Sequence, residues 1–482
     1  MLVASGAWLL RIAGFFHRGG ALGHPVDYDE GVYFSAAALL SHGVLPYRDY
    51  FFVHPPGIAV LLAPVAALAR GFDAALAFTV VRWLVPVFGA LSTLLCGRIA
   101  QTQWGTWAGV VAALAYAVFP KSSSTERGLF LEPLLNLTCL AMAWVWLRHR
   151  SNDSPWRRDL LAGGLLATAC AIKLTAGAWV IAMVWALGLA GQGRRALWVV
   201  LVAAVVGLVW LGPFFALAPT AMLDGLLRFQ LLRPPDGELD VWRRLLLILR
   251  EGHVGLTALS LLGLLLALSR TGRREAVAER LFSAAWLLTV ATFLSSKSYW
   301  IQYNAHLAPT MAVLAGLGAS VPLRWAQTRS RTQAALVTAT VILLALSPLP
   351  VAIRAAKQSD RGLLALGNTL RNAAPTDAAL CTFEPAWAIA AGRIPGIPRG
   401  APVLVDPYGL MLSDSLGGPG RFANAAAAFE DERSQRSMLP LLERCDVLVL
   451  GGRGEWQLSS SSEHWVQQHF RNEGPLWRRV PE

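Results

Sequence analysis

The sequence predicts an all-α polytopic membrane domain followed by a small C-terminal α/β domain. Hydrophobic residues make up 55% of the 482 residues and charged residues only 15%, whereas a soluble domain carries about 25% charge. The mean hydropathy is +0.47. Tryptophans outnumber tyrosines by 19 to 8, and tryptophan favours the membrane–water interface. Apolar runs fill residues 1–350, and residues 351–482 have a different, more polar composition.

Residues 1–350 contain about eleven segments that we predict to be transmembrane helices. A hydrocarbon core about 30 Å thick needs about 20 helical residues. The first segment is the weakest because it is short and contains Arg11, so the true start codon is left open. A cleaved signal peptide is the alternative, although its basic n-region is missing. The predicted spans lie near 1–16, 74–97, 99–120, 131–147, 159–173, 174–193, 196–217, 253–269, 281–296, 299–320 and 332–350.

The basic residues indicate the orientation of these spans. Residues 1–350 hold 28 Lys and Arg against 16 Asp and Glu, which accounts for the net charge of +12, because residues 351–482 hold 14 of each. With a cytoplasmic N-terminus, the predicted cytoplasmic turns hold 14 basic and four acidic residues, in agreement with the positive-inside rule. An odd number of spans in the cell inner (plasma) membrane then places residues 351–482 outside the cytoplasm. A nucleic-acid partner is not expected, because such proteins concentrate basic residues on one face or tail.

Residues 351–482 are expected to form a small extracytoplasmic α/β domain. The apolar runs at 403–406 and 446–450 predict short buried strands, and residues 422–444 predict helices between them. Gly451–Gly454 is interpreted as a turn at a strand end rather than a nucleotide-binding loop, because it lacks the GxGxxG spacing. Cys381 and Cys445 could form a disulfide in this compartment or remain a buried free pair.

The first outer loop, residues 17–73, is the most unusual segment of the membrane part. Three carboxylates occur within four residues, at Asp27, Asp29 and Glu30. They could hold a general base or bind a divalent cation, or they could simply cap a helix over residues 32–40. The apolar run at 57–69 is too short to span a bilayer comfortably, so we expect it to re-enter the membrane or lie at its surface.

Four short motifs stand out in the membrane part. They are Asp29-Glu30 with Tyr33, Pro46-Tyr47-Arg48-Asp49, His54-Pro55-Pro56, and Arg127 followed by Glu132-Pro133. Together they resemble the GT-C glycosyltransferases, which use polyprenyl-phosphate sugars as donors, and in particular glycosyltransferase family 39 and its relatives, the protein O-mannosyltransferases and the lipid A aminoarabinose transferases. The resemblance implies a GT-C-like membrane domain over residues 1–350, with a catalytic first outer loop.

The resemblance also implies roles for residues of the first outer loop. Asp29 matches the acidic residue regarded in the family as the catalytic base, and Glu30 is its catalytic partner in the motif. Tyr33, Arg48, Asp49 and His54 are then candidates for substrate binding. Some relatives carry a metal-binding Glu one residue before the position of His54, where this chain has Val53. No cofactor is therefore certain, and a divalent metal ion stays open, with Asp29 and His54 as candidate ligands.

Further along the chain, five residues are candidates for binding the donor substrate. Arg127 could clamp a phosphate bidentately or form a surface ion pair with a nearby Glu. Lys173 could hold a lipid phosphate or merely extend toward the interface from a helix end. His306 could belong to the site or be a packing residue. The full set is Arg127, Glu132, Lys173, Lys297 and His306.

The resemblance implies an integral membrane glycosyltransferase that moves a sugar from a polyprenyl-phosphate donor to a hydroxyl outside the cytoplasm, with inversion. The acceptor would be a glycan, a lipid or a protein. A polytopic transporter is one alternative, but transporters carry ionisable residues near the midplane and repeated halves. Here nearly all charges map to span ends, and we find no repeat. A non-catalytic protein that binds lipid-linked glycans is the second alternative.

Overall fold

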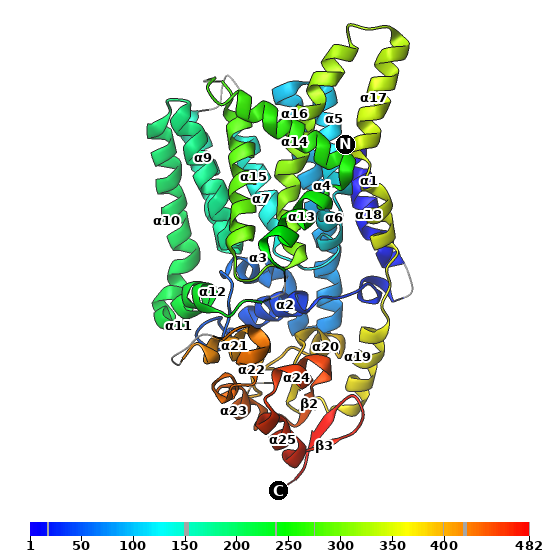
Figure 1. Ribbon diagram of the computed structural model, residues 1–482. Coiled ribbons are helices and arrows are strands. Elements are labelled where there is room, and N and C mark those ends of the chain that lie inside the picture. The colour runs from blue at the N-terminus through cyan, green and yellow to red at the C-terminus, as the bar shows by residue number, and fades with distance from the viewer. Residues whose placement is uncertain are drawn as a thin grey trace. The chain divides into compact units, whose positions relative to one another are not determined.

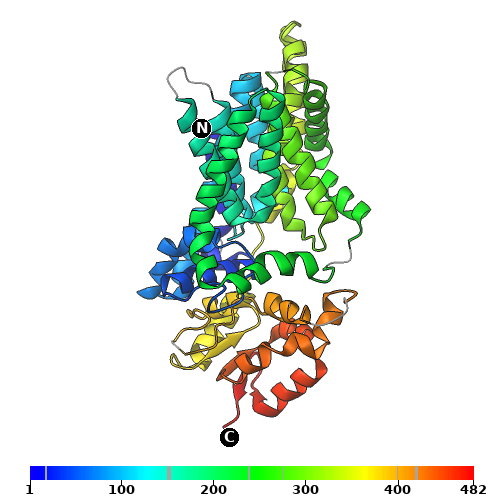
Figure 2. The same ribbon diagram turned by 90° about the vertical axis from the view of Figure 1, so that its left-hand side faces the viewer.

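The computed structural model describes residues 1–16, 19–148, 154–236, 239–273, 275–398, 400–417 and 422–481. These residues are mostly helical, with one small sheet (Figures 1 and 2). They form two compact units. The helical unit comprises Met1–Ala13, Leu84–Trp210 and Glu238–Lys357, and the mixed unit comprises Gly14–Trp83, Leu211–Gly237 and Gln358–Glu482.

The helical unit is built almost wholly of apolar helices, some of them broken by short 3-10 turns. Two of its helices, α4 and α10, continue into the mixed unit. Its elements are α1 (Leu2–Ile12), α4 (Ala74–Trp104), α5 (Thr106–Val118), α6 (Pro120–Thr125), α7 (Glu132–Leu147), α8 (Pro155–Ile172), η4 (Leu174–Ala176), α9 (Gly177–Leu189), α10 (Gly193–Leu217), α13 (Val241–Glu251), α14 (His253–Ser269), α15 (Val277–Ser295), η6 (Ile301–Leu307), α16 (Ala308–Ala326), α17 (Arg331–Ala345) and α18 (Leu349–Ala356).

Glycines bring α16 close to its neighbours in this unit. A Cβ on Gly263 of α14 would collide with the carbonyl oxygen of Leu314, and one on Gly316 would lie 2.7 Å from the carbonyl oxygen of Ala108 in α5. The α14–α16 and α5–α16 pairs make the most extensive helix contacts of the unit, and Figure 1 shows the three helices together. Small residues at such crossings let backbones approach and increase dispersion contacts.

Each predicted span coincides with a helix, but the boundaries differ. Helix α4 runs unbroken from Ala74 to Trp104, and the break falls at Gly105, whose φ is 100°. The division predicted between 97 and 99 is therefore wrong. By length and composition, four helices among the described residues could cross a membrane, or up to six if each bent pair counts as one span. The number of eleven stays a prediction.

The mixed unit combines the first outer loop with the C-terminal segment. Residues 17 and 18 of that loop lie outside the described residues. The elements of the unit are η2 (Gly20–Gly23), α2 (Tyr28–Ser41), α3 (Gly57–Ala66), η3 (Ala67–Arg70), α11 (Pro219–Leu223), η5 (Asp224–Arg228), α12 (Phe229–Leu232), α19 (Gly362–Ala373), β1 (Leu380–Thr382), α20 (Pro385–Ala390), α21 (Pro407–Ser415), α22 (Ala425–Phe429), η7 (Glu432–Gln435), α23 (Met438–Leu442), β2 (Val447–Val449), α24 (Gly451–Gln457), α25 (Ser460–His469), β3 (Phe470–Asn472) and β4 (Trp477–Arg479).

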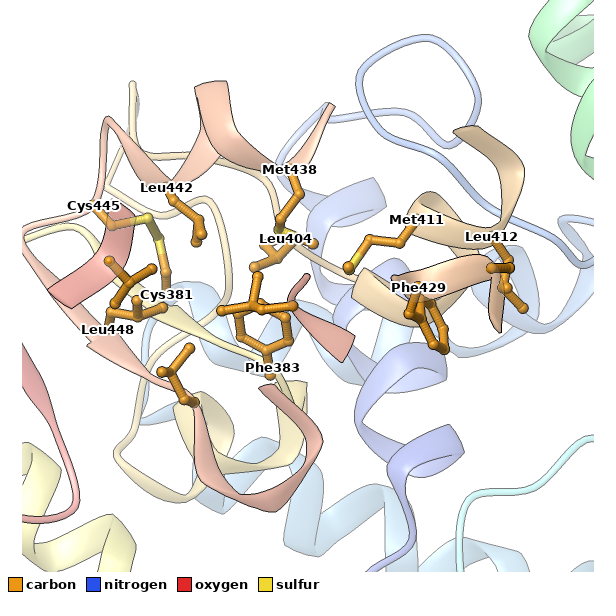
Figure 3. Packing of buried hydrophobic residues seen from close by; sticks show 14 of the residues in the cluster. Cys381, Phe383, Leu404, Met411, Leu412, Phe429, Met438, Leu442, Cys445 and Leu448 are labelled. Carbon is orange, nitrogen blue, oxygen red and sulfur yellow. A yellow bond between two sulfur atoms is a disulfide. The ribbon is translucent and has the colours of Figure 1, made fainter. Parts of the chain in front are cut away.

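The sheet has the strand order β1-β2-β4-β3, with β1 and β2 parallel and the other pairs antiparallel. Strand β2 confirms the strand expected at 446–450. It is apolar at every position because both of its faces are buried. Leu448 packs into one hydrophobic cluster with Cys381 and Met438 (Figure 3). Val447 and Val449 pack into another.

The strand expected at 403–406 is wrong. Leu404 and Val405 are buried, as the pattern suggested, but they pair with no strand. Asp406 accepts a hydrogen bond from the Gly409 N–H at 2.9 Å and caps α21. The parallel partner of β2 is instead β1, which the sequence analysis did not anticipate. The glycines at 451–454 begin helix α24 directly after β2.

The compact units also divide the chain differently from the boundary predicted at residue 350. Val53 of the first outer loop and Phe229 of α12 belong to the same buried cluster as Phe383 and Leu448 of the C-terminal segment. The side-chain amide of Gln230 donates to the Val53 carbonyl at 3.1 Å. The first outer loop therefore shares a core with residues 358–482, and the membrane boundary at 350 stays a prediction.

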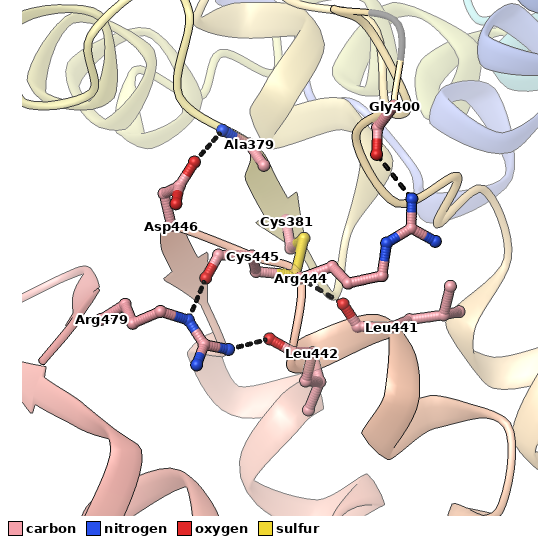
Figure 4. Close-up of a disulfide and its surroundings, with 9 residues drawn as sticks. All are labelled: Ala379, Cys381, Gly400, Leu441, Leu442, Arg444, Cys445, Asp446 and Arg479. Atoms are coloured by element: carbon pink, nitrogen blue, oxygen red, sulfur yellow. Dashed lines mark hydrogen bonds between the residues drawn. A yellow bond between two sulfur atoms is a disulfide. The ribbon is translucent and has the colours of Figure 1, made fainter. Parts of the chain in front are cut away.

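Cys381 and Cys445 form a disulfide, which resolves the two alternatives left by the sequence. Their Cα atoms are 5.9 Å apart, and Cys381 lies in β1 while Cys445 lies just before β2. Arg479 donates to the Cys445 and Leu442 carbonyls, each at 2.9 Å, so β4 is tied to the same corner (Figure 4).

We expect the Cys381→Ser variant to unfold its C-terminal segment at a lower temperature. The bond joins residues 64 positions apart, and closing such a loop stabilises the folded state by about 4 kcal/mol in the chain-entropy model. Protease resistance of residues 358–482 during heating in detergent would measure the loss. The control is Cys170→Ser, which removes a free thiol. Equal resistance of both variants would contradict the expectation.

Candidate functional site

The acidic motif forms the first turn of α2. The Asp27 carboxylate accepts a hydrogen bond from the Asp29 N–H at 3.1 Å, and the Glu30 carboxylate accepts one from the Asp27 N–H at 3.1 Å. This capping box satisfies N–H groups that a helix start leaves without partners. The helix predicted over 32–40 therefore begins earlier, at Tyr28, and the capping interpretation of the acidic cluster is confirmed for Asp27 and Glu30.

A buried ion pair fixes Glu30. Its Oε2 lies 3.0 Å from Nε of Arg82, and both side chains are at most 1% exposed. The Arg82 guanidinium also donates to the carbonyls of Ala21, of His24 at 3.3 Å and of Pro25 at 2.9 Å. A buried arginine needs such partners because burial strips its hydration. Glu30 thus anchors the approach to α2, which points to a positioning role beside its neighbour Asp29.

Asp29 is half-buried, between the fully buried side chains of Tyr28 and Glu30. Tyr33 follows four residues later, on the same side of α2. The Tyr33 hydroxyl lies 3.3 Å from Nε2 of His54, and their rings pack edge to face. The structure therefore places His54 of the first outer loop beside Tyr33, one helical turn after Asp29.

The chain around Tyr47 holds His54 from its backbone side. Tyr47 has a φ of 67°, a conformation that residues other than glycine rarely adopt. Its hydroxyl donates to the His54 carbonyl at 2.5 Å, and its N–H donates to the Tyr50 carbonyl at 2.9 Å. In the sequence, Tyr47 stands out only as part of the Pro46–Asp49 motif, and no local pattern predicts this conformation.

Arg48 and Asp49 form a bidentate pair with each other, at 2.9 and 2.7 Å. The hydrogen bond from Arg48 lowers the pKa of the Asp49 carboxyl. Asp49 also accepts from the Leu45 N–H at 2.7 Å, so the pair closes the turn. Both side chains are exposed or half-buried, and their substrate-binding role stays a prediction.

In the helical unit, Glu132 and Lys173 lie together. The Lys173 ammonium is 2.6 Å from the Glu132 carboxylate and 3.9 Å from the centre of the Tyr303 ring. One turn after Glu132, the side-chain oxygen of Asn136 accepts a hydrogen bond from Nδ1 of His306 at 2.8 Å. Helix α7 therefore presents Glu132 and Asn136 on one face, and sequence analysis missed Asn136 as part of this cluster.

The other two cations that are candidates for donor binding, Lys297 and Arg127, lie in different surroundings. Lys297 is half-buried, between α15 and η6, and has no ion pair among the described residues. Arg127 is fully buried, and one of its terminal nitrogens donates to the carbonyls of Ala352 at 3.1 Å and Leu10 at 3.4 Å. The surface ion pair considered for Arg127 is therefore wrong.

Glu126 pairs instead with Arg11, the residue that weakened the first predicted span. Nε of Arg11 lies 2.5 Å from Oε2 of Glu126, and neither side chain is exposed. The Tyr116 hydroxyl donates to the same carboxylate at 2.6 Å. An arginine among apolar residues is tolerated when a buried carboxylate compensates its charge. No local pattern in the sequence indicates that Glu126 is the partner of Arg11.

The predicted site residues thus fall into two sets, one in each unit. The mixed unit brings together Asp29, Glu30, Tyr33 and His54, and the helical unit brings together Glu132, Lys173 and His306. In the part of the chain that the structure describes, no three His, Cys, Asp or Glu side chains are grouped so that they could hold a metal ion. Asp29 and His54 therefore gain no third ligand of these types within the described residues.

Comparison with solved structures identifies the fold. The aminoarabinose transferase ArnT from Cupriavidus metallidurans, bound to undecaprenyl phosphate, matches over 82% of this chain and 84% of its own, with a TM-score of 0.62 and 15% identity. The oligosaccharyltransferase AglB from Archaeoglobus fulgidus, with an inhibitory peptide and a dolichol-phosphate, matches over 93% and 69%, with a TM-score of 0.62 and 12% identity. This chain has the GT-C fold.

The match confirms the GT-C-like fold that the resemblance implied. The roles of Asp29, His54 and Glu132 stay predictions. Sequence comparison adds nothing to the match, because no known family profile and no curated protein matches the chain. At such low identity, the likeness of ArnT and AglB concerns the arrangement of the backbone.

Gly31→Ala should destabilise the mixed unit by about 1–3 kcal/mol, the usual cost of overpacking. A Cβ at this position would lie 2.5 Å from the Ala386 backbone nitrogen, so α2 would have to move away from α20. Gly212→Ala in α10 is the matched control, because no atom lies within 4 Å of its added Cβ. Thermal unfolding in detergent would compare them, and equal midpoints would show that the α2–α20 contact is not close.

Proposed function

We propose that this protein is an integral membrane glycosyltransferase that transfers a sugar from a polyprenyl-phosphate donor to a hydroxyl outside the cytoplasm, with inversion. The observation that carries the proposal is the half-buried Asp29 in a helix turn fixed by a capping box and by the buried Glu30–Arg82 pair. The GT-C fold supports it, since ArnT and AglB were each solved with a polyprenyl-type phosphate bound.

In the proposed reaction, the acceptor oxygen attacks the anomeric carbon while the bond from that carbon to the phosphate oxygen breaks. The bonding electrons leave with the lipid phosphate, and the hydroxyl proton passes to the Asp29 carboxylate. Attack opposite to the leaving group inverts the configuration. Because the phosphate is already a good leaving group, the protein mainly positions the reactants and stabilises charge.

Lys173 and Lys297 are the cations that we assign to the leaving phosphate. Lys173 is half-buried, so its interaction with an anion is screened less than at a fully exposed site. Its pairing with Glu132 fixes the ammonium in place before the donor binds. Arg127 is left out of this assignment because its guanidinium is buried against backbone carbonyls.

The disulfide supports the proposed location of the acceptor. Disulfides persist in oxidising compartments, such as the bacterial periplasm, and are rare in the cytosol. A bond between Cys381 and Cys445 therefore favours an extracytoplasmic mixed unit, where the acceptor would be a glycan, a lipid or a protein. The positive-inside orientation predicted from the sequence leads to the same side.

Asp29→Asn should lower turnover by about 100-fold or more, as expected when a general base is lost. The purified protein would be given a panel of undecaprenyl-phosphate hexoses and pentoses, and release of undecaprenyl phosphate would be measured with water or added glycans as acceptor. Asp27→Asn is the matched control, because asparagine caps a helix as well as aspartate does.

Turnover of Asp29→Asn equal to that of Asp27→Asn would remove Asp29 from the mechanism. Wild-type protein that binds the donors without releasing lipid phosphate would instead favour the non-catalytic binding protein. Retained binding by Asp29→Asn together with lost release is the result that supports the enzyme.

Lys173→Gln should weaken binding of undecaprenyl phosphate by about tenfold, the effect of losing one charged contact of about 1.4 kcal/mol. Native mass spectrometry of the detergent-solubilised protein would give the affinity. Lys357→Gln is the control, because it removes the same charge from an exposed position at the end of α18. Equal weakening by both variants would show that Lys173 holds no phosphate.

A further inference from the structure

The first turn of α2 is held by the C-terminal segment of its own unit at three points. Gly31 packs against the backbone of Ala386 at the start of α20. The Tyr28 hydroxyl is bonded to Asp406, and the Arg453 guanidinium lies over the Tyr28 ring, 4.3 Å from its centre. Neither the capping box nor the Arg82 pair involves this segment, so these contacts are a separate set of restraints.

Tyr28 and Asp406 form the central contact. The Tyr28 hydroxyl donates to Oδ1 of Asp406 at 2.8 Å and accepts from the Tyr408 N–H at 3.2 Å. Both side chains are buried, at 8% and 6% exposure. Burial raises the pKa of the Tyr28 phenol, which therefore keeps its proton and acts as the donor.

One oxygen of Asp406 joins the starts of two helices. Besides the Tyr28 hydroxyl, Oδ1 accepts the Gly409 N–H at 2.9 Å, which makes Asp406 the N-cap of α21. Tyr28 is the first residue of α2 and directly precedes Asp29. A displacement of the Asp406 side chain would therefore shift Tyr28 and, with it, the backbone of Asp29.

Arg453 restrains the same tyrosine from its ring face. Its Nε lies 3.0 Å from Oε1 of Glu384, the residue before α20. A guanidinium stacked on an aromatic ring and paired with a carboxylate has little freedom to move. The Tyr28 side chain is thus fixed at its hydroxyl by Asp406 and at its ring by Arg453.

We propose that Asp406 is a positioning residue for Asp29, acting through the Tyr28 hydroxyl. This inference rests on the proposed function and gives the C-terminal segment a part in the reaction. A base must be held at a defined distance from the acceptor hydroxyl, and a displacement of about 1 Å can cost about 100-fold in rate. The segment would contribute no atom to the chemistry but would set the place of the atom that takes the proton.

The decisive comparison is Tyr28→Phe against Tyr408→Phe. Both remove one phenolic hydroxyl from the same unit, buried at Tyr28 and half-buried at Tyr408. The Tyr408 hydroxyl, however, donates to Asp236 at 2.5 Å and not to α2. With the undecaprenyl-phosphate sugar that the wild type turns over, Tyr28→Phe should lower kcat by about 10- to 100-fold at little change in KM. Tyr408→Phe should keep kcat within about threefold of the wild type. Equal loss of kcat in both variants would overturn the proposal.

Substitutions at Asp406 supply a rescue test. Asp406→Asn keeps a side-chain oxygen that can accept from Tyr28 and Gly409, whereas Asp406→Ala keeps none. We expect Asp406→Asn to retain most of kcat and Asp406→Ala to match Tyr28→Phe. An asparagine variant as inactive as the alanine variant would show that the charge rather than the hydrogen bond matters, and would contradict the proposal.

Hydrogen–deuterium exchange of the amides at 29–33 gives a readout that does not depend on turnover. Loss of the Tyr28 hydrogen bond should speed exchange there about fivefold, and Tyr408→Phe should leave it unchanged. A wild type that is inactive on every donor refutes the proposed function. Normal kcat in Tyr28→Phe, with an active wild type, refutes only the positioning role, whether or not exchange changes.

Discussion

The stability of the mixed unit depends on the pairing of the charges that are buried in its interior. Glu30 and Arg82 are buried together, and removal of one partner would leave the other charged and without compensation, at a cost of about 3–5 kcal/mol. The Arg82 guanidinium also donates hydrogen bonds to the carbonyls of Ala21, His24 and Pro25, and these bonds fix the backbone that leads to α2. The capping box then sets where the helix starts. These neighbours orient the Asp29 side chain, and no pattern in the sequence reveals them.

The helical unit also buries a pair of opposite charges. Arg11 and Glu126, which lie 115 positions apart, satisfy each other among apolar residues. Small residues such as Gly263 and Gly316 lie where helix backbones meet closely. Hydrophobicity alone does not distinguish one helix partner from another when every helix is apolar. The buried pair and the glycines therefore supply the specificity that the apolar surfaces lack.

The general plan of the protein was accessible from the sequence because it depends on periodic and compositional signals. Apolar runs located every long helix, and the motif around Asp29 led to the GT-C fold. Local boundaries were less accessible: the run at 403–406 has the pattern of a buried strand, but Pro407 and the cap at Asp406 turn it into a helix start. Strand β1 was missed because its three residues end on the polar Thr382, whereas β2 lies within the longer apolar run at 447–450. The pairings of Arg11 with Glu126 and of Glu30 with Arg82 join distant positions, and no local pattern reports them.

The bond between Tyr28 and Asp406 has a consequence for the timing of synthesis. The two residues are 378 positions apart, so the ribosome makes the first turn of α2 long before its acceptor exists. Helices that enter a membrane early would carry Asp29 in a turn that is still loosely held. Under the proposed function, completion of the final quarter of the chain would then also be the step that makes the protein active, and a nascent chain would not turn over its substrate before it has folded.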